Sequence, residues 1–480
     1  MNILFVYSRQ DYLTRVKPLE NPEQIQFGIS YISAFLKKHG HSTKLLILTK
    51  ETPRKIIDKY LNEFSPSLVC FTAVFSEYAF VSKIAQYIKE TYPHIYLLCG
   101  GPHVSLNPEC CLKESFDALC IGEGEYPTLE LAQYLEQGRI PVGIANLWIK
   151  CDGKVEKNSP RPFIKDIDSL PFPDREMWQE WIMEPGSCCS VLASRGCPFQ
   201  CTYCCNHALK KITSGQYVRF RSPGNIVQEI KEIVSCYPTI REFFFEAETI
   251  VLNKNFAVEL ALALESFNNT LDRPLSFGAI MRIVPNVEVD NIFAAFKKSN
   301  FRFINIGLES GSERVRSQIL KRDYSNEDVL RVSALARKYG LKVCFYNLIG
   351  IPTETAEDIR ATININRRCL PDWHFLSIFF PYPGTDLYLL CQEKGLIKGC
   401  LDTELERHKV VLGFPEKVKK RIMKSYIWFD YYVYKGYKPL YKILARVIVS
   451  KLKTQYLANL IYRKLISHNL FAKLRNLLRS

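Results

Sequence analysis

Short apolar runs alternate with amphipathic segments over the first 140 residues of the chain. The apolar runs occupy residues 2–7, 43–48, 67–73, 95–99 and 116–121. The segment 28–40 has helical spacing of its apolar residues and ends at Gly40, where a helix C-terminal glycine is expected. Continuous apolar strands alternating with helices predict an α/β fold with a doubly wound parallel sheet, Rossmann-like in kind.

The alternation stops at residues 140–187 and resumes over residues 190–380. The interruption contains a predicted strand pair, with a turn at Asp152-Gly153, and then a proline-rich stretch. Six further strands, at 190–195, 242–247, 275–281, 303–309, 342–350 and 374–380, predict a partial (β/α)6 barrel of the TIM type. We therefore expect four parts: a domain at 1–140, a linker at 141–187, the barrel at 188–400 and a basic helical region at 401–480.

Polar and glycine-rich loops follow the predicted strands of both domains, at the edge where such folds bind their ligands. In the first domain these loops are Thr72–Ser76, Gly100–His103 and Gly122–Glu125. The absence of GxGxxG after the first strand argues against a dinucleotide. In the barrel, the strand ends carry a cysteine loop and the residues Glu246, Glu248, Arg282, Glu309, Gly350 and Pro352.

Three cysteines, Cys197, Cys201 and Cys204, form the pattern CxxxCxxC after the first barrel strand. Three thiolates can hold three irons of a four-iron cluster and leave the fourth iron open to a substrate or cofactor, which indicates reactive chemistry. The alternative is a zinc site completed by Cys205 or His207. Paired carboxylates on a barrel are also typical of glycoside hydrolases, so glycoside hydrolysis is an alternative function. The neighbouring cysteines argue strongly against that alternative.

Bulk composition is that of a globular protein, with 47% hydrophobic and 24% charged residues. The start of the chain does not resemble a signal peptide, and no apolar window approaches the ~18 residues of a membrane span. The 17 cysteines then indicate a reducing compartment and are suggestive of anaerobic life. We expect a cytoplasmic protein.

The net charge of +15 is concentrated in the tail. Residues 417–480 carry 16 Lys and Arg but one acid, Asp430, so the rest of the chain is neutral. Basic residues mixed with apolar residues at helical spacing are typical of helices that lie on anionic membranes, here the inner face of the membrane. A helical domain packed on the barrel is the equal alternative. Nucleic-acid binding has no recognition motif in its favour.

Several motifs recur in the order in which they occur in one superfamily. They are CGGPHV, CIGEGEYPTLEL, IDSLPFPD, CPFQCTYC, IGLESGSERV and LIGIPTET. On these residues the chain, over about positions 1–400, resembles the radical S-adenosylmethionine enzymes, and more narrowly those with an N-terminal cobalamin-binding domain. The resemblance implies a [4Fe-4S] cluster, S-adenosylmethionine and cobalamin as cofactors.

The resemblance also assigns expected roles to residues. Cys197, Cys201 and Cys204 would ligate the cluster, and Glu246-Ala247-Glu248 would receive the amino group of S-adenosylmethionine through a charge-assisted hydrogen bond. The remaining expected contacts to S-adenosylmethionine are Tyr203 beside the adenine, Arg282 and Glu309 at the carboxylate and ribose, and Gly350 and Pro352 along the adenine. Cys205 would be a bystander.

Cobalamin would be held by loops of the first domain. The residues expected to do so are Thr72, Ser76, Gly100, Gly101, His103, Gly122, Glu123 and Gly124. The chain departs from the wider family of cobalamin domains at the loop after the first strand. This loop, SRQDYLTR, lacks the histidine of a DxHxxG motif. Cobalt would then have no histidine ligand from this loop, and a domain that has lost the cofactor is an alternative.

The implied reaction is radical methylation of an unactivated carbon in a small-molecule, lipid or peptide substrate, with methylcobalamin as the methyl donor. An electron donor such as flavodoxin or ferredoxin would reduce the cluster. Cyclisation, ring contraction or rearrangement without methyl transfer is the enzymatic alternative. A membrane-surface binding protein is the alternative from another class, and its support is the basic tail.

Overall fold

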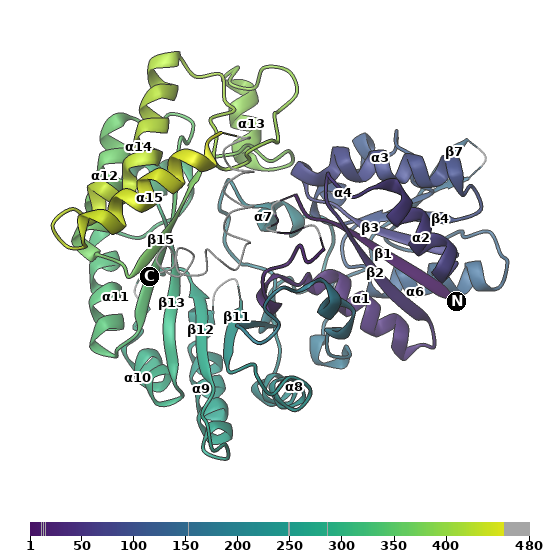
Figure 1. Ribbon diagram of the computed structural model, residues 1–480, viewed down its shortest axis with the longest axis horizontal. Helices are drawn as coiled ribbons and strands as arrows, with labels where there is room; N and C mark the ends of the chain where they lie inside the picture. The colour runs from purple at the N-terminus through teal and green to yellow at the C-terminus, as the bar shows by residue number, and fades with distance from the viewer. Residues whose placement is uncertain are drawn as a thin grey trace. The chain divides into compact units, whose positions relative to one another are not determined.

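The chain forms two compact units, each with its own sheet, in a computed structural model (Figure 1). The structure describes residues 1–455, except 11, 13, 15, 152, 248, 249 and 286. The first unit comprises Met1–Ser187 and Cys205–Arg221, and the second comprises Cys188–Cys204 and the chain from Ser222 onward. The segment Cys205–Arg221, directly after the cysteine motif, thus belongs with the first unit, which the strand pattern did not indicate.

The sheet of the first unit has seven strands in the order β2-β1-β3-β4-β5-β6-β7. Strands β1 to β5 pair in parallel, and β6 and β7 add antiparallel pairs at one edge. The strands are β1 (Asn2–Ser8), β2 (Ser42–Leu48), β3 (Leu68–Thr72), β4 (Tyr96–Gly100), β5 (Ala118–Cys120), β6 (Leu147–Cys151) and β7 (Lys154–Lys157). The expected strand pair in residues 140–187 is present as β6 and β7, and it extends this same sheet.

Helices connect these strands as the alternation predicted. They are α1 (Phe27–Lys38), α2 (Arg54–Phe64), α3 (Phe75–Thr91), α4 (Pro102–Leu106), α5 (Pro108–Cys111) and α6 (Glu125–Glu136). The same unit contains 3-10 turns at Pro22–Gln24, Ile167–Ser169 and Glu176–Trp181, and helix α7 (Cys205–Leu209), which follows the cysteine motif. Gly40 lies two residues after the end of helix α1, and its φ of 85° and the hydrogen bond from its N–H to the carbonyl of Lys37 make it the left-handed glycine that closes the helix.

The sheet of the second unit has six strands, all parallel, in the order β15-β14-β13-β12-β11-β8. They are β8 (Cys189–Leu192), β11 (Glu242–Glu246), β12 (Ser276–Met281), β13 (Phe301–Glu309), β14 (Lys342–Ile349) and β15 (Trp373–Ile378). Two short strands, β9 (Ser194–Arg195) and β10 (Arg219–Phe220), are not part of this six-stranded sheet. Neighbouring strands follow chain order, as in a β/α barrel, and β8 and β15 form its two edges.

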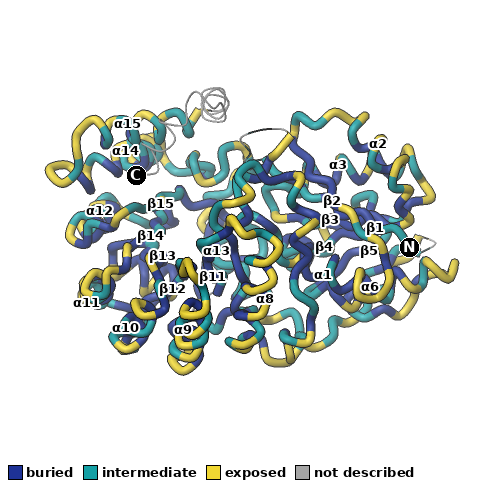
Figure 2. Tube along the Cα trace, turned by 60° about the horizontal axis from the view of Figure 1, so that its bottom comes forward, coloured by how far each residue is buried: buried dark blue, intermediate teal, exposed yellow. Residues whose placement is uncertain are grey.

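Helices α8 to α12 lie outside these strands, and their outer surfaces are exposed while the strands are buried (Figure 2). The helical elements are α8 (Pro223–Cys236), η4 (Ile250–Leu252), α9 (Lys254–Asn268), α10 (Asp290–Lys298), the π-helix η5 (Val315–Ile319), α11 (Asn326–Lys338), α12 (Ala356–Cys369), α13 (Asp386–Glu393), α14 (Glu416–Tyr434) and α15 (Leu440–Lys453). Capping boxes begin α11, at Ser325 and Asp328, and α12, at Thr355 and Asp358. These observations confirm the predicted fold class, including the helical C-terminal region.

Phenylalanines fill the interior of the second sheet. The ring of Phe277 contacts those of Phe243, Phe245 and Phe301, with centroids 5.5–6.3 Å apart. Phe296, from helix α10, stacks on Phe301 at 4.0 Å and so fastens helix to sheet. Each large buried ring contributes roughly 2–3 kcal/mol through removal from water. This rigid core fixes where the carboxyl ends of the strands lie.

Candidate functional site

The cysteine loop leaves strand β8 and crosses the carboxyl ends of its sheet. Cys197 and Cys201 are 9% and 7% exposed, and Cys204 is half-buried. Thr202 anchors the loop, because its hydroxyl donates to the carbonyl of Ile319 at 2.6 Å and its carbonyl accepts from the N–H of Leu387 at 2.8 Å. The three predicted ligand thiols are therefore held on one short segment, sheltered from bulk water.

Arg282 follows strand β12 and reaches the second cysteine of the motif. Its Nη1 donates to the sulfur of Cys201 at 2.8 Å, and its guanidinium lies over the ring of Phe199 at 3.8 Å. Arg282 itself is 8% exposed. A guanidinium that donates to a sulfur can offset the negative charge that a metal-bound thiolate carries. The structure thus brings together a predicted cluster ligand and a residue that we expected at S-adenosylmethionine.

Arg322 is a second buried cation at this loop, and the strand pattern did not indicate it. Its Nη1 donates to the hydroxyl of Tyr203 at 2.9 Å and lies 3.6 Å from a carboxylate oxygen of Glu309. The same nitrogen is 3.8 Å from the sulfur of Cys201. Burial raises the pKa of the Tyr203 phenol well above its ordinary value, so the phenol stays protonated. Arg322 links three residues that the sequence marked separately.

Glu309 ends strand β13 in a strained backbone conformation. Its φ of 60° is left-handed, and the register with β14 shifts between Gly307 and Glu309. Arg322 and Tyr324 hold this bulge by donating to the carbonyl of Gly307 at 2.6 and 3.0 Å. Left-handed non-glycine residues concentrate at functional sites, where surrounding contacts maintain the strain. The bulge sets the direction of the Glu309 side chain.

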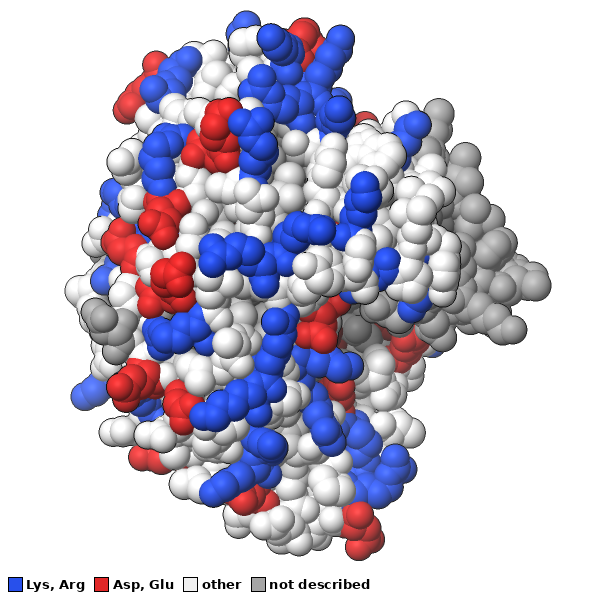
Figure 3. All heavy atoms as spheres, turned by 90° about the vertical axis from the view of Figure 1, so that its left-hand side faces the viewer, with Lys and Arg blue, Asp and Glu red and all other residues white. Residues whose placement is uncertain are grey.

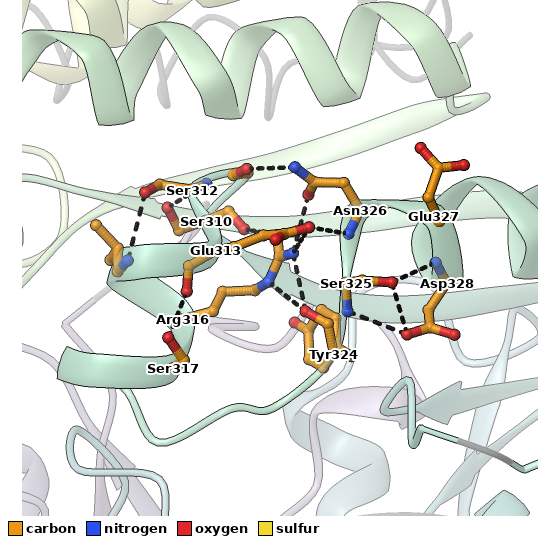
Figure 4. Close-up of polar contacts among 12 residues, drawn as sticks. Ser310, Ser312, Glu313, Arg316, Ser317, Tyr324, Ser325, Asn326, Glu327 and Asp328 are labelled. Atoms are coloured by element: carbon orange, nitrogen blue, oxygen red, sulfur yellow. Dashed lines mark hydrogen bonds and ion pairs between the residues drawn. The ribbon is translucent and has the colours of Figure 1, made fainter.

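A buried polar network shapes the turn after Glu309 (Figure 4). Arg316 is fully buried, and it donates to the carbonyls of Ser310 at 2.6 Å and Tyr324 at 3.0 Å and to the side-chain oxygen of Asn326 at 2.9 Å. Arg316 lies in the π-helix η5, a form that recurs at functional sites. The network is a second feature that the sequence pattern did not indicate.

The remaining expected contacts for S-adenosylmethionine lie on strand ends of the same sheet. Glu246 is the last residue of β11, where its carbonyl accepts from the N–H of Ala193, and the residue is half-buried. Glu248 lies outside the described residues. Gly350, with φ of 77°, and the buried Pro352 form the loop after β14.

Glu354, which was not among the predicted residues, closes this loop. Its Oε2 accepts from the N–H groups of Gly350, at 2.6 Å, and Ile351, at 3.4 Å. Burial raises its pKa to about 8. A neutral, buried carboxyl therefore fixes the loop expected to lie along the adenine.

Thiol chemistry at this loop suits a cluster. Thiolates bind iron, and in a four-iron cluster each thiolate binds a different iron, so their sulfurs need not converge on one point. Among the residues that the structure describes, no three His, Cys, Asp or Glu side chains converge where a single ion could bind. Cys205 and His207, the alternative zinc ligands, begin helix α7 of the first unit.

In the first unit, the carboxyl-end loops after β3, β4 and β5 are joined by hydrogen bonds. Ala73 donates to the carbonyl of Gly100, His103 to that of Ala73, and Gly122 to the hydroxyl of Ser105, at 3.0–3.2 Å. Gly101 has φ of 100°, and a Cβ there would lie 2.7 Å from the Thr72 hydroxyl. Gly101 is required because its loop packs closely against the end of β3.

The expected cobalamin residues divide into two groups by their contacts. Thr72 and Gly100 end strands β3 and β4, and Ser76 lies in the first turn of helix α3. All three are half-buried, and the hydroxyls of Thr72 and Ser76 suit a polar ligand. Gly122, with φ of 87°, lies beside the amide of Asn146, and a Cβ at Gly124 would lie 2.7 Å from Ile32. Both of these glycines serve close packing.

His103 and Glu123 make their contacts within the fold. The His103 ring lies between Phe75 and Tyr78, with centroids 5.3 and 4.6 Å away, and burial lowers its pKa to about 4. Glu123 accepts from Arg219 at 2.9 Å and from the N–H of Ile164 at 2.7 Å. These contacts hold the two side chains in the loops where we expect cobalamin, and their contact with the cofactor stays a prediction.

Comparisons with known proteins agree with the two-unit fold. Residues 191–365 match the model of the radical SAM superfamily, and residues 22–132 match that of the B12 binding domain. An uncharacterized methyltransferase of Pyrococcus horikoshii is 30% identical over 366 residues, which cover 75% of this chain and 77% of that protein. The anaerobic magnesium-protoporphyrin IX monomethyl ester cyclase of Rubrivivax gelatinosus is 24% identical, over 76% of this chain and 66% of the cyclase.

Among solved structures, the chain is similar to the radical S-adenosylmethionine methyltransferase TsrM of Kitasatospora setae, determined with cobalamin and a [4Fe-4S] cluster bound. The TM-score is 0.66 at 18% identity, over 82% of this chain and 78% of that one. Fold, site and sequence relationship thus define one class of protein. The chain belongs to the radical SAM superfamily and carries the B12 binding domain of its cobalamin-dependent members.

The cofactors of this class are those that the resemblance implied: a [4Fe-4S] cluster, S-adenosylmethionine and cobalamin. The enzyme class is that of radical SAM enzymes with methyltransferase relatives. In the described part of the chain, none of the helices combines the length and apolar character that a bilayer crossing requires.

Proposed function

We propose that the protein methylates an unactivated carbon of its substrate by radical chemistry. When bound, the cofactors supply the demanding steps: S-adenosylmethionine gives the radical that removes a hydrogen atom, and methylcobalamin gives the methyl group. The methyltransferase relative supports methyl transfer as the outcome. The observation that carries the proposal is the sheltered cysteine loop, with a guanidinium 2.8 Å from one of its sulfurs.

In this proposal Cys197, Cys201 and Cys204 ligate the cluster, and Cys205 does not. Arg282 and Arg322 hold the loop in place and offset the negative charge of its thiolates. Both guanidiniums are rigidly packed, Arg282 on Phe199 and Arg322 under the β13 bulge. Positioned charges of this kind act without reorganising during a reaction.

Other side chains of the second unit would bind and orient S-adenosylmethionine. Glu246 would accept from its amino group, together with Glu248, and Arg282 would meet its carboxylate. Glu309, whose backbone is held in a left-handed conformation, would meet the ribose. Tyr203, Gly350 and Pro352 would line the adenine, with the Tyr203 hydroxyl held by Arg322. In the first unit, Thr72, Ser76 and the backbone at Gly100–Gly101 would contact cobalamin.

Iron loading tests the cluster assignment. Anaerobically reconstituted protein should bind about four irons per chain. Replacing Cys197, Cys201 and Cys204 with alanine should remove the visible absorption and all 5′-deoxyadenosine formation, whereas the matched control Cys205→Ala should keep both. A triple variant that retains its cluster, or a control that loses it, would contradict this set of ligands.

Two further measurements test cobalamin binding and methyl transfer. Protein incubated with hydroxocobalamin and desalted should retain corrinoid colour; a colourless protein would favour a domain that has lost the cofactor. Incubation with methyl-labelled S-adenosylmethionine and a chemical reductant should label the product. An unlabelled, ring-closed product would favour cyclisation, the chemistry named for the Rubrivivax relative. We also propose flavodoxin or ferredoxin as the physiological reductant.

A further inference from the structure

Helix α15 presents a row of apolar side chains to solvent. Leu440, Tyr441, Leu444 and Ile448 are 56%, 63%, 39% and 59% exposed. Leu440, Leu444 and Ile448 follow one another at intervals of four residues, and Tyr441 precedes Leu444 by three, so all four lie on one side of the helix. Tyr437, just before the helix, is 59% exposed. A separate face, with Ile443 and Val447, is buried. The helix therefore has two apolar faces, and its packing uses one.

Helix α14 adds aromatic and basic groups to this exposed surface. Trp428 and Tyr432, one turn apart, are 37% and 36% exposed. Exposed Lys417, Lys420 and Lys424 occupy the preceding turns at the same helical spacing. Of the 16 large hydrophobic side chains exposed in the described chain, seven fall between Trp428 and Ile448. Such clustering marks an interaction surface, since exposed apolar residues are otherwise scattered singly.

Negative charge is nearly absent from these helices. Residues 416–455 contain eleven Lys and Arg but two acids, Glu416 and Asp430. Asp430 is buried between Arg446, at 3.2 Å, and His374, at 3.5 Å, and Glu416 is paired with Lys419 at 3.0 Å. Figure 3 shows this side of the second unit, where uncharged surface is bordered by Lys and Arg. We call the exposed side of residues 417–448 the α14–α15 face.

We propose that the α14–α15 face docks on an anionic lipid bilayer. Apolar and aromatic side chains flanked by lysines suit the interface of such a membrane, where the rings and aliphatic groups enter the headgroup region and the ammonium groups meet lipid phosphates. A second copy of this chain is a poorer occupant, because it would bring two strongly basic faces together. The inference goes beyond methylation and is independent of it.

Vesicle binding of the full-length protein tests the proposal. We expect co-sedimentation with vesicles of phosphatidylcholine and phosphatidylglycerol at low salt, weakened by salt and weaker on phosphatidylcholine alone. The variant Leu444→Gln/Ile448→Gln should lower affinity on the order of tenfold or more. The matched controls are Leu262→Gln on α9 and Leu389→Gln on α13, where the leucines are 53% and 52% exposed; they should bind as the parent protein does.

Charge reversal on helix α14 gives an independent variant that leaves the exposed apolar side chains of helix α15 unchanged. Lys420→Glu/Lys424→Glu should weaken binding at least about fivefold for each lysine. Lys297→Glu/Lys298→Glu, exposed on helix α10, is the control. Thermal melting should show all variants folded.

Four outcomes would overturn the proposal, and three of them come from the vesicle assay. They are no binding to anionic vesicles, equal loss in the control variants, or an equally tight, salt-independent binding to neutral vesicles. A protein dimer that the Leu444→Gln/Ile448→Gln variant dissociates, with no vesicle binding, would likewise overturn it and assign the face to self-association. The assay uses neither reductant nor S-adenosylmethionine, so its failure is distinguishable from failure of the methylation proposal.

Discussion

Arg282 donates a hydrogen bond to the sulfur of Cys201 across 2.8 Å, although 80 residues separate the two in sequence. The contact joins the end of strand β12 to the middle of the cysteine loop. Phe199, two residues before Cys201, forms the surface on which the guanidinium rests. A cation is therefore fixed beside one of the proposed cluster ligands, where it can influence the cluster's electrons.

Replacing Arg282 should lower the reduction potential of the cluster. Reduction adds negative charge, and a buried cation that donates to a ligand sulfur stabilises the reduced state. Arg282→Met should make the midpoint potential more negative on the order of 50 mV, since a charge-assisted hydrogen bond is worth about one tenfold change in equilibrium. Redox titration followed by electron paramagnetic resonance measures this. Arg282→Lys should recover part of the shift; an unchanged potential in Arg282→Met at full iron content would contradict the assignment.

Among the buried arginines Arg282, Arg316 and Arg322, we expect Arg316 to give the largest loss of stability when it is replaced. Its substitution by methionine leaves the carbonyls of Ser310 and Tyr324 buried without their donor. We expect a loss of about 3–5 kcal/mol in the free energy of unfolding, measured by urea denaturation. Arg331→Met is the matched control, because its pair with Asp328 is on the surface, and it should change stability by less than about 1 kcal/mol. Equal effects in the two variants would contradict a supporting role for the buried network.

Gly311 permits helix α12 to approach the turn after Glu309. A Cβ at Gly311 would lie 2.3 Å from the carbonyl oxygen of Ala361, and backbone of a helix cannot move aside cheaply. Gly311→Ala should destabilise the protein by about 2–3 kcal/mol and weaken binding of S-adenosylmethionine, measured by calorimetry. Gly224→Ala, on helix α8 with nothing within 4 Å, should be neutral or slightly stabilising.

Strand periodicity was sufficient to predict which residues lie at the carboxyl edge of the second sheet. Arg282 follows strand β12, Glu309 ends β13 and the cysteine loop follows β8, so alternation alone places them at one edge. Arg322 gave no such signal, because it follows an irregular π-helix and its path back to Tyr203 depends on how that helix packs. In the sequence, Arg322 is a basic residue in a polar loop and belongs to none of the motifs.

The first unit shows the same limit of sequence reasoning. His103 and Glu123 lie in the predicted glycine-rich loops, and both were expected at cobalamin. Their side chains contact Tyr78 and Arg219 of the same unit, and their role at cobalamin stays a prediction. Arg219 follows the cysteine motif by 15 residues, and nothing in the strand pattern places it beside Glu123. Pairing between distant segments depends on tertiary packing, which local periodicity does not report.

Glu354 should make stability fall as pH rises through the neutral range. Burial raises its pKa from an ordinary 4.5 to about 8, and its Oε1 is buried without a hydrogen-bond partner among the described residues. Between these two pH values the folded protein holds a proton that the unfolded chain has lost. Raising the pH therefore removes stability, on the order of 5 kcal/mol in total, and the loss levels off above pH 8.

The variant Glu354→Gln isolates this effect, because the amide oxygen can still accept from Gly350 while carrying no titratable proton. Its unfolding free energy, measured by urea denaturation at a series of pH values, should exceed that of the parent protein by an amount that grows from about pH 5 to pH 8. Glu327→Gln, on the exposed first turn of α11, is the control and should follow the parent protein at every pH. A constant difference between Glu354→Gln and the parent would show that Glu354 keeps its ordinary pKa in the folded state. In that case the loop at Gly350 would be held by a carboxylate, and the hydrogen bonds from Gly350 and Ile351 would outweigh the cost of burying its charge.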